Sequence, residues 1–279
     1  MNENREYIFP TQPFIVLETE NFRQRIYGRN GISHFYQFSV PEKQVVRAVP
    51  DGCIDLIFEY TKEGMNGFEV GTVLSYEEQV WTGPKEVFGV RFFPGVQPSI
   101  LKTNPGEVLQ NRVPLMKMLK DKRLLPIMEA EKRFDARVRA FLHFYKEAGE
   151  EKRKPYGKKE LVNSIRQLAC QSGGKIKISE MSKKTGYSER YLNKVFSEAM
   201  GFSPKAFCKM MQFQCALDYL NHNTPEKMTD LAVMLGYYDQ PQFIRDFKNF
   251  AGITPKRYLR MMQQEKENRR LSDQFLKIV

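Results

Sequence analysis

The second half of the chain contains two copies of one pattern, ISEMSKKTGYSERYLNKVFSEAMGFSP (178–204) and MTDLAVMLGYYDQPQFIRDFKNFAGITP (228–255). Four pairs of matching residues share one offset of 51 residues: Leu192 and Phe243, Phe196 and Phe247, Gly201 and Gly252, and Pro204 and Pro255. Gly186 and Gly236 are 50 residues apart, so the turn of the second copy has one extra residue. Self-similarity at a fixed period indicates a structural unit that occurs twice.

Each copy predicts a short helix, a tight turn and a second helix. The first helix ends at a glycine, which adopts the left-handed conformation of a helix C-terminus without a steric penalty. Ser188 and Asp239 are the expected N-caps of the second helices, and Pro241 suits a first helical turn. Apolar residues recur on one inward face of these helices: Leu192, Val195, Phe196 and Ala199, then Phe243, Phe247 and Phe250. Each copy is therefore predicted to be a helix-turn-helix unit.

The opposite faces of the two second helices carry side chains that suit the reading of bases in duplex DNA. The candidates are Arg190, Asn193 and Lys194 in the first copy, and Gln240, Gln242 and Arg245 in the second. Arg and Lys donate hydrogen bonds to guanine, and Asn and Gln pair with adenine. The alternative is a polar face that only meets water, and for a single copy this alternative is favoured.

The charge of the chain is divided unevenly. Residues 1–150 contain 20 Lys and Arg against 20 Asp and Glu, whereas residues 151–279 contain 24 against 13, so the formal charge of +11 lies entirely in the second half. A neutral half joined to a basic half indicates that one part meets a polyanion. Together with the repeat and its glycine turns, this balance favours DNA contact over a solvated face.

Residues 158–262 resemble the AraC/XylS family of transcription regulators. The resemblance is carried by GYSERYLNKVFSEAMGFSP (186–204), PKAFCKMMQFQCALDYLNH (204–222), DLAVMLGY (230–237) and FIRDFKNFAGITPKRY (243–258). It implies two helix-turn-helix units joined by a long helix, with the six candidates above facing successive major grooves about 34 Å apart. The candidates for phosphate contacts are Lys183, Lys184, Lys205, Lys248 and Lys256. Three residues depart from the family pattern: Ser182 stands for the usual Ala, Gln212 for a basic residue, and Pro241 is unusual in the second reading helix.

The first half predicts a β-rich domain, so the fold class is α+β overall. Strands are expected over QVVRAV (44–49), CIDLIFEY (53–60), FEVGTVL (68–74) and EVFGVRFF (86–93), which suits a β-barrel or sandwich. PDGCIDLIFEY (50–60), GVRFFPG (89–95) and NRVPL (111–115) resemble the N-terminal domain of a subgroup of AraC-like regulators. The resemblance implies a barrel-like regulatory domain.

An apolar stripe at helical spacing predicts a helix over residues 126–147. The stripe either packs on its own domain or pairs with a second subunit as a homodimer. The charged segment KEAGEEKRKPYGKK (146–159) resembles an interdomain linker. The expected domains are 1–148, a linker over 149–159, a double helix-turn-helix domain over 160–262, and a tail over 263–279.

Residues 53, 55, 57 and 59 share one face of a strand, which brings together Cys53, Asp55 and Glu59. With Arg91 on a neighbouring strand, Cys53 and Asp55 are candidate ligand-binding residues in a polar barrel interior. The alternative is that Ile54, Leu56 and Phe58 face the core while the acids face water, and it is the favoured one.

The chain lacks patterns typical of an enzyme. Its three histidines, His34, His143 and His222, are scattered, and no metal-ligand spacing, nucleophile elbow or phosphate-binding loop is present. No catalytic residue, metal or cofactor is therefore expected, and the four cysteines are expected to be reduced. No secretory signal or membrane span is expected, so the predicted location is cytoplasmic. The expected partners are double-stranded DNA, a small-molecule effector and, for an activator, RNA polymerase.

Overall fold

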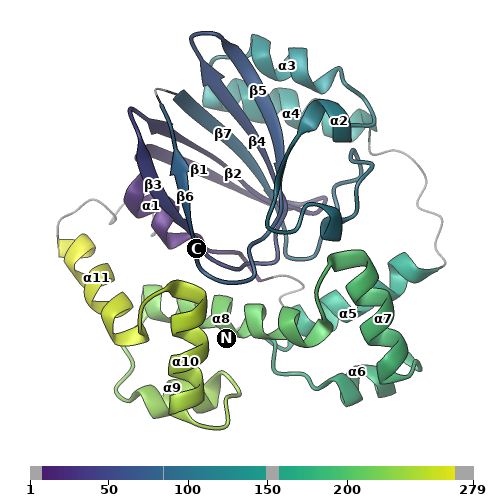
Figure 1. Cartoon of the computed structure of the whole chain (residues 1–279), viewed down its shortest axis with the longest axis vertical. Helices are drawn as coiled ribbons and strands as arrows, with labels where there is room; N and C mark the ends of the chain where they lie inside the picture. Colours follow the sequence, from purple (N-terminus) through teal and green to yellow (C-terminus); the bar gives the residue numbers. More distant parts are fainter. Residues whose placement is uncertain (1–7, 84, 149–156, 268–279) are drawn as a thin grey trace.

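The computed structural model describes residues 8–83, 85–148 and 157–267. Its first part is β-rich and its second part is helical, which confirms the predicted α+β class (Figure 1). A six-stranded antiparallel sheet has the order β1-β2-β7-β4-β5-β8, and a second sheet pairs β3 with β6. The strands are β1 Glu20–Arg29, β2 Ile32–Val40, β3 Gln44–Ala48, β4 Asp55–Thr61, β5 Gly64–Val70, β6 Glu77–Trp81, β7 Lys85–Phe92 and β8 Arg112–Pro114.

The β-rich domain is built in three layers. The small sheet packs on one face of the large sheet, where the rings of Phe38 and Trp81 meet edge to face at 5.5 Å between centroids. Two helices, α3 (Leu124–Ala130) and α4 (Phe134–Ala148), supply apolar side chains to the other face. There the ring of Phe141 meets that of Phe35 at 5.9 Å. The sandwich is thus filled with apolar side chains on both faces of its large sheet.

The four predicted strands are present, with differences at their ends. β3, β4 and β7 overlap the predicted segments, whereas the strand expected over 68–74 ends at Val70. Gly71 leaves the sheet and its backbone N–H donates to the carbonyl of Asn111 at 3.1 Å. Strands β1, β2, β6 and β8 were not predicted. β1 is an edge strand with many charged, exposed residues, so its sequence lacks a clear alternation.

The helix predicted over 126–147 is wrong as a single element, because residues 131–133 separate α3 from α4. Its apolar stripe packs on the sheet of its own domain, where Val138, Phe141 and Tyr145 are buried. Of the two alternatives for the stripe, packing within the domain holds. Pairing of residues 126–147 with a second subunit stays a prediction.

The second part of the chain contains seven described helices in two similar groups. They are α5 Lys158–Gln171, α6 Ile178–Thr185, α7 Glu189–Met200, α8 Pro204–His222, α9 Met228–Met234, α10 Gln240–Ala251 and α11 Pro255–Glu267. Figure 1 shows α8 crossing between the groups, with α5–α7 at one end and α9–α11 at the other. Part of the expected linker lies outside the described residues, and α5 already begins at Lys158. The expected tail overlaps α11 as far as Glu267, and its remainder lies outside them as well.

The local signals of the repeat are confirmed. Gly186 and Gly236 have φ angles of 76° and 83°, in the left-handed region expected of the turn. The side chain of Ser188 accepts a hydrogen bond from Tyr191 N, and that of Asp239 accepts one from Gln242 N. Pro241 lies in the first turn of α10, where its missing N–H costs nothing. Its unusual position therefore does not distort the helix.

Helix α8 contributes to both helical cores. Phe207 and Met211 from α8 pack with α5–α7, whereas Phe213 and Leu217 pack with α9–α11. The β-rich domain also enters these cores, because Phe14 from the short helix α1 (Pro13–Glu18) is fully buried in the second one. The two helix-turn-helix units and the β-rich domain therefore form one continuous packed structure.

Candidate nucleic-acid interface

The candidate reading helices are α7 and α10. Each buries one apolar face, with Leu192 and Phe196 in α7 and Phe243 and Phe247 in α10 at no more than 1% exposure. Because the period of a helix fixes which residues lie opposite this buried face, the polar candidates are turned outward. The same local sequence that folds each unit therefore also presents its polar face.

The three candidates on α7 differ in their exposure and in their contacts with other side chains and the backbone. Arg190 and Lys194 are exposed, and Asn193 is half-buried. The amide of Asn193 donates to the carbonyl of Glu189 in its own helix at 2.9 Å. Lys194 lies 3.9 Å from Glu198, a separation at which an exposed ion pair is weak. Arg190 is thus an exposed candidate in the first turn of α7.

On α10 the exposed candidate is Arg245, whereas Gln240 and Gln242 are half-buried. The side-chain oxygen of Gln240 accepts a hydrogen bond from Thr229 Oγ1 at 2.8 Å, which ties the start of α10 to α9. Gln240 therefore has a structural contact as well as a predicted reading role. Arg190 and Arg245 are the exposed arginines among the six reading candidates, one in each unit.

The five candidate phosphate contacts are all exposed: Lys183, Lys184, Lys205, Lys248 and Lys256. Lys205 and Lys256 are also related by the repeat, since each follows the proline that starts a helix. The hydroxyls of Ser203 and Thr254 cap these helices by accepting from Ala206 N at 3.1 Å and Arg257 N at 3.3 Å. A lysine beside a helix N-terminus suits a phosphate group, because the N–H groups there carry partial positive charge.

Two of the residues that depart from the family pattern make hydrogen bonds inside the units. The hydroxyl of Ser182 donates to the carbonyl of Tyr187 at 2.6 Å, across the turn of the first unit. The amide of Gln212 in α8 donates to the carbonyl of Leu235 at 3.1 Å, at the end of α9. Both residues thus fix a turn from within the protein.

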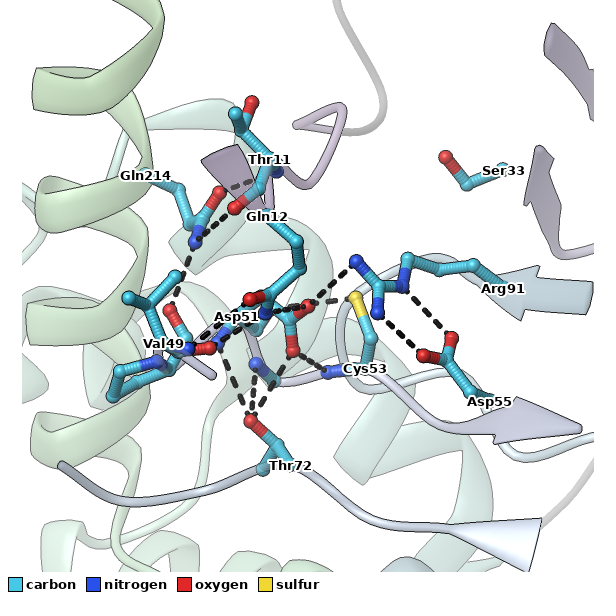
Figure 2. Close-up of polar contacts among 12 residues, drawn as sticks. Thr11, Gln12, Ser33, Val49, Asp51, Cys53, Asp55, Thr72, Arg91 and Gln214 are labelled. Atoms are coloured by element: carbon cyan, nitrogen blue, oxygen red, sulfur yellow. Dashed lines mark hydrogen bonds and ion pairs between the residues drawn. The ribbon is translucent and has the colours of Figure 1, made fainter. Parts of the chain in front are cut away.

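The β-rich domain holds a buried ion-pair cluster next to the helical domain (Figure 2). Arg91 on β7 and Asp55 on β4 are directly opposed in the antiparallel register. Arg91 Nε donates to Asp55 Oδ1 at 2.8 Å, its Nη2 contacts Asp55 Oδ2, and its Nη1 lies 3.4 Å from Asp51 Oδ2. The hydroxyl of Tyr36 also donates to Asp55, at 3.0 Å. One guanidinium therefore neutralises part of the charge of two buried carboxylates.

Burial controls the protonation of this cluster. It raises the pKa of the Asp55 carboxyl, against the lowering effect of Arg91. It also raises the pKa of the Cys53 thiol well above its usual value, and the negative charge of Asp51 adds to this rise. A thiol with a raised pKa is a poor nucleophile, because the thiolate is the reactive form.

Neither of the two sequence interpretations of this strand is wholly right. Ile54, Leu56 and Phe58 do face the core, but Asp55 and Glu59 are buried at 6% exposure and do not face water. Glu59 pairs with Lys85 at 2.9 Å and with Arg112 at 2.7 Å. The acids stay buried because basic residues on other strands of the sheet pair with them, which the strand's own sequence does not reveal.

A hollow lies at the boundary between the two domains. It is lined by Phe9–Gln12 of the N-terminal segment, by His34, Tyr36 and Arg91 of the large sheet, and by Asp218, Asn221 and His222 of α8. Arg91 lines this hollow, whereas Cys53 and Asp55 are not among its lining residues. Burial lowers the pKa of His34 to about 3, with Arg91 as a second cause, so its imidazole is neutral at physiological pH.

Sequence reasoning missed the polar residues that join the domains. Gln214 is fully buried in α8, and it contacts Thr11 and Pro50 of the β-rich domain (Figure 2). Gln12 contacts Asp51 and the backbone of Val49. The only sequence signal was a glutamine within the largely apolar segment FQCAL, and a polar residue in such a place needs a buried partner.

Two families match parts of this chain. Residues 181–261 match a family described as a helix-turn-helix domain, and residues 29–114 match a domain of unknown function, DUF6597. The first match contains both reading helices and α8 between them. The C-terminal part of this chain thus contains a helix-turn-helix domain, which the structure shows to be two helix-turn-helix units. It belongs to the AraC type, as its resemblance in sequence implied.

The curated relatives match in this domain. The chain is 35% identical over 83 residues to an uncharacterized HTH-type transcriptional regulator of Staphylococcus aureus (strain MSSA476), covering 30% of this chain and 11% of the relative. It is 24% identical over 106 residues to the Msm operon regulatory protein of Streptococcus mutans, covering 38% of each chain. The chain thus spans about a tenth of the length of the first of these relatives.

Two solved structures are similar to this one. A probable AraC family transcriptional regulator from Rhodopseudomonas palustris is similar over 37% of this chain and 96% of its own, with 28% identity and a TM-score of 0.34. ToxT from Vibrio cholerae is similar over 86% of this chain and 98% of its own, with 10% identity and a TM-score of 0.45. Within the described residues, no helix is both long and apolar enough for a membrane span.

Proposed function

We propose that the protein is a sequence-specific DNA-binding transcription regulator that reads two successive major grooves with α7 and α10. The observation that carries this proposal is the presence of two repeat-related helix-turn-helix units, each with an exposed arginine on its outward face, joined by one helix. Arg190 and Arg245 are the principal base readers, with Asn193, Lys194, Gln240 and Gln242 beside them. The five exposed lysines contact phosphates and give the complex most of its salt dependence.

We propose further that the β-rich domain controls this binding in response to a small molecule. The hollow supports this, because it is lined by residues of both domains and Arg91 reaches it. An effector there contacts the sheet and α8 at once, so it favours one arrangement of the two domains over another. This assignment moves the expected ligand site from the interior of the sandwich, which apolar side chains occupy, to the boundary of the domains.

The proposal assigns no reaction, metal or cofactor to the chain. As a regulator of transcription, the protein acts in the cytoplasm, where bacterial DNA is found. RNA polymerase is its further partner if it activates transcription. A homodimer through residues 126–147 would place two such DNA-binding domains on one operator.

The test is binding of the full-length protein to the DNA upstream of its own gene, compared with a scrambled duplex of equal composition, over a series of salt concentrations. We expect a preference for the native duplex that persists at physiological salt. Equal and steeply salt-dependent binding to both duplexes would show a polyanion-binding surface without sequence reading, and would contradict the proposal.

The Arg245→Ala substitution separates reading from phosphate contact. We expect it to cost about 1–3 kcal/mol on the cognate duplex and to relax the preference for one base pair, because a bidentate donor to guanine is lost. Lys256→Ala is the matched control: it should weaken binding to all duplexes alike and reduce the salt dependence. Equal weakening of every duplex by Arg245→Ala would remove this residue from the reading surface.

A further inference from the structure

Both reading helices end against the β-rich domain. The helices α7 and α10 end at Gly201 and Gly252, which occupy matching positions of the repeat and have φ angles of 80° and 72°. Each glycine lies against a different loop of the β-rich domain. The two contacts are independent of the reading residues and of the hollow.

The first contact is between backbones. The short helix η1 (Pro105–Glu107) lies so close to the end of α7 that a Cβ atom added to Gly106 would be 2.8 Å from Gly201 N. A Cβ added to Gly201 would be 3.0 Å from Gly106 Cα and from a methyl group of Leu109. The contact between the two glycines does not yield, because neither Gly106 nor Gly201 has a flexible side chain that can move away.

The second contact joins the loop before β6 to the end of α10. The ring of Tyr76 lies against Gly252, where an added Cβ atom would be 3.0 Å from the ring. The backbone N–H of Tyr76 donates to the carbonyl of Asn249 at 3.2 Å. This carbonyl is in the last turn of α10, where carbonyl groups have no partner within the helix. The β-rich domain thus supplies a hydrogen bond that α10 cannot make itself.

A third contact holds the middle of α8. Gln214 Oε1 accepts from Thr11 N at 2.7 Å, and its Nε2 donates to the carbonyls of Pro50 at 2.8 Å and Thr11 at 3.3 Å (Figure 2). The loop that carries Pro50 is itself held by Asp51, whose carboxylate bonds Gln12 and Thr72 and lies beside Arg91. This loop therefore connects α8 to the ion-pair cluster in the sheet.

We infer that the β-rich domain positions the two reading helices relative to each other, and that Tyr76 and Gly106 thereby determine which spacing between two DNA half-sites the protein accepts. This inference rests on the proposed function. Within the helical domain, α8 is the helix that joins the two units, and it could bend or twist. The contacts of the β-rich domain with the ends of α7 and α10 and with the middle of α8 oppose such movement. Tyr76 and Gly106 are positioning residues, since they act through α10 and α7 and do not face the DNA-reading side chains.

The dependence of affinity on the spacing between the two DNA half-sites tests such a restraint. In duplex DNA an added base pair moves the second half-site by about 3.4 Å and rotates it by about 34°. A rigidly held pair of helices cannot follow this change without losing contacts, whereas a pair with freedom about α8 can follow part of it. Loss of the restraint is therefore expected to change the ratio of the affinities for two spacings. This ratio does not depend on the overall affinity of the variant.

The experiment uses the full-length protein and duplexes selected by it from a random pool. The two protected stretches are moved apart or together by one base pair, and the affinities are compared. We expect the wild type to lose about tenfold in affinity for each change, and Tyr76→Ala to lose about threefold or less. Tyr76→Phe keeps the ring on Gly252 and should behave like the wild type. Gly106→Ala, which displaces the end of α7, should also broaden the spacing preference or shift its optimum.

The possible results of this experiment distinguish the inference from the proposed function. The inference is supported if the spacing preference is lost in Tyr76→Ala, broadened or shifted in Gly106→Ala and retained in Tyr76→Phe, with native circular dichroism in all three. Variants that fold but bind every spacing with the wild-type ratio overturn it, as does a wild-type protein that selects a sequence yet accepts all spacings. A wild-type protein that selects no sequence at all contradicts the proposed function itself.

Discussion

At the scale of single residues, Arg91 is the buried positive charge that pairs with the carboxylates near the boundary of the two domains. It is buried at 5% exposure, pairs with Asp55, approaches Asp51 and lies over the ring of Tyr36 at 5.5 Å. A buried ion pair gives little net stability when complete, but it is costly to break, because the remaining charge has neither water nor a partner.

Arg91→Leu is therefore expected to lower the free energy of unfolding by about 3–5 kcal/mol. The measurement is equilibrium unfolding in urea, followed by circular dichroism. Arg190→Leu is the matched control, because Arg190 is exposed on α7 and its loss should leave stability nearly unchanged. Equal midpoints for wild type and Arg91→Leu would show that the two aspartates do not depend on this guanidinium.

At the scale of elements, the four glycines of the two units have one local role and two different surroundings. Gly186, Gly201, Gly236 and Gly252 all have positive φ angles. No atom lies within 4 Å of a Cβ added to Gly186, whereas a Cβ on Gly201 would meet Gly106 Cα at 3.0 Å. Both positions require the backbone conformation, but of these two glycines only Gly201 also requires the missing side chain.

This difference predicts two sizes of effect. Gly186→Ala should lower the free energy of unfolding by about 1–2 kcal/mol, the cost of a left-handed residue with a Cβ atom. Gly201→Ala should cost more, because the added methyl group must displace η1 as well. Denaturant unfolding of the two variants measures both values. A smaller loss for Gly201→Ala than for Gly186→Ala would mean that the contact with η1 yields readily.

At the scale of the whole molecule, two buried groups in the β-rich domain make opposite contributions to the pH dependence of stability. Burial raises the pKa of Glu69 from 4.5 to about 7, while the hydroxyl of Thr103 bonds its carboxyl group at 2.9 and 3.0 Å. Burial lowers the pKa of His34 from 6.5 to about 3. Glu69 favours folding below pH 4.5 and loses this contribution as pH rises to about 7. His34 favours folding above pH 6.5 and loses its contribution as pH falls to about 3.

Glu69→Gln separates the two groups, because the amide keeps the shape and does not titrate. The free energy of unfolding of the wild type minus that of the variant should fall by about 3 kcal/mol between pH 4.5 and 7. The measurement is urea unfolding at several pH values across this range. A difference that stays constant with pH would show that Glu69 titrates near its ordinary pKa in the folded protein.

Patterns among residues that are close together in the sequence predicted the helices of the helical domain well and the strands of the β-rich domain in part. Gly186, Ser188 and Asp239 act within a few residues, so their roles follow from local geometry alone. The partners of Glu59 do not, because Lys85 and Arg112 lie on strands that are distant in the chain. The candidate reading residues could be placed on outward faces from helical period. Their roles in reading stay predictions.

The sequence by itself therefore determined the two helix-turn-helix units, their buried and outward faces, and the division of charge between the halves. Periodicity, capping residues and glycine turns express these features locally. Tertiary structure alone decided that Asp55 pairs with Arg91, that Gln214 bonds Thr11 across 203 residues, and that both reading helices end on the β-rich domain. Such contacts form only when distant segments fold together, and their cost in chain entropy is offset by packing that no single segment contains.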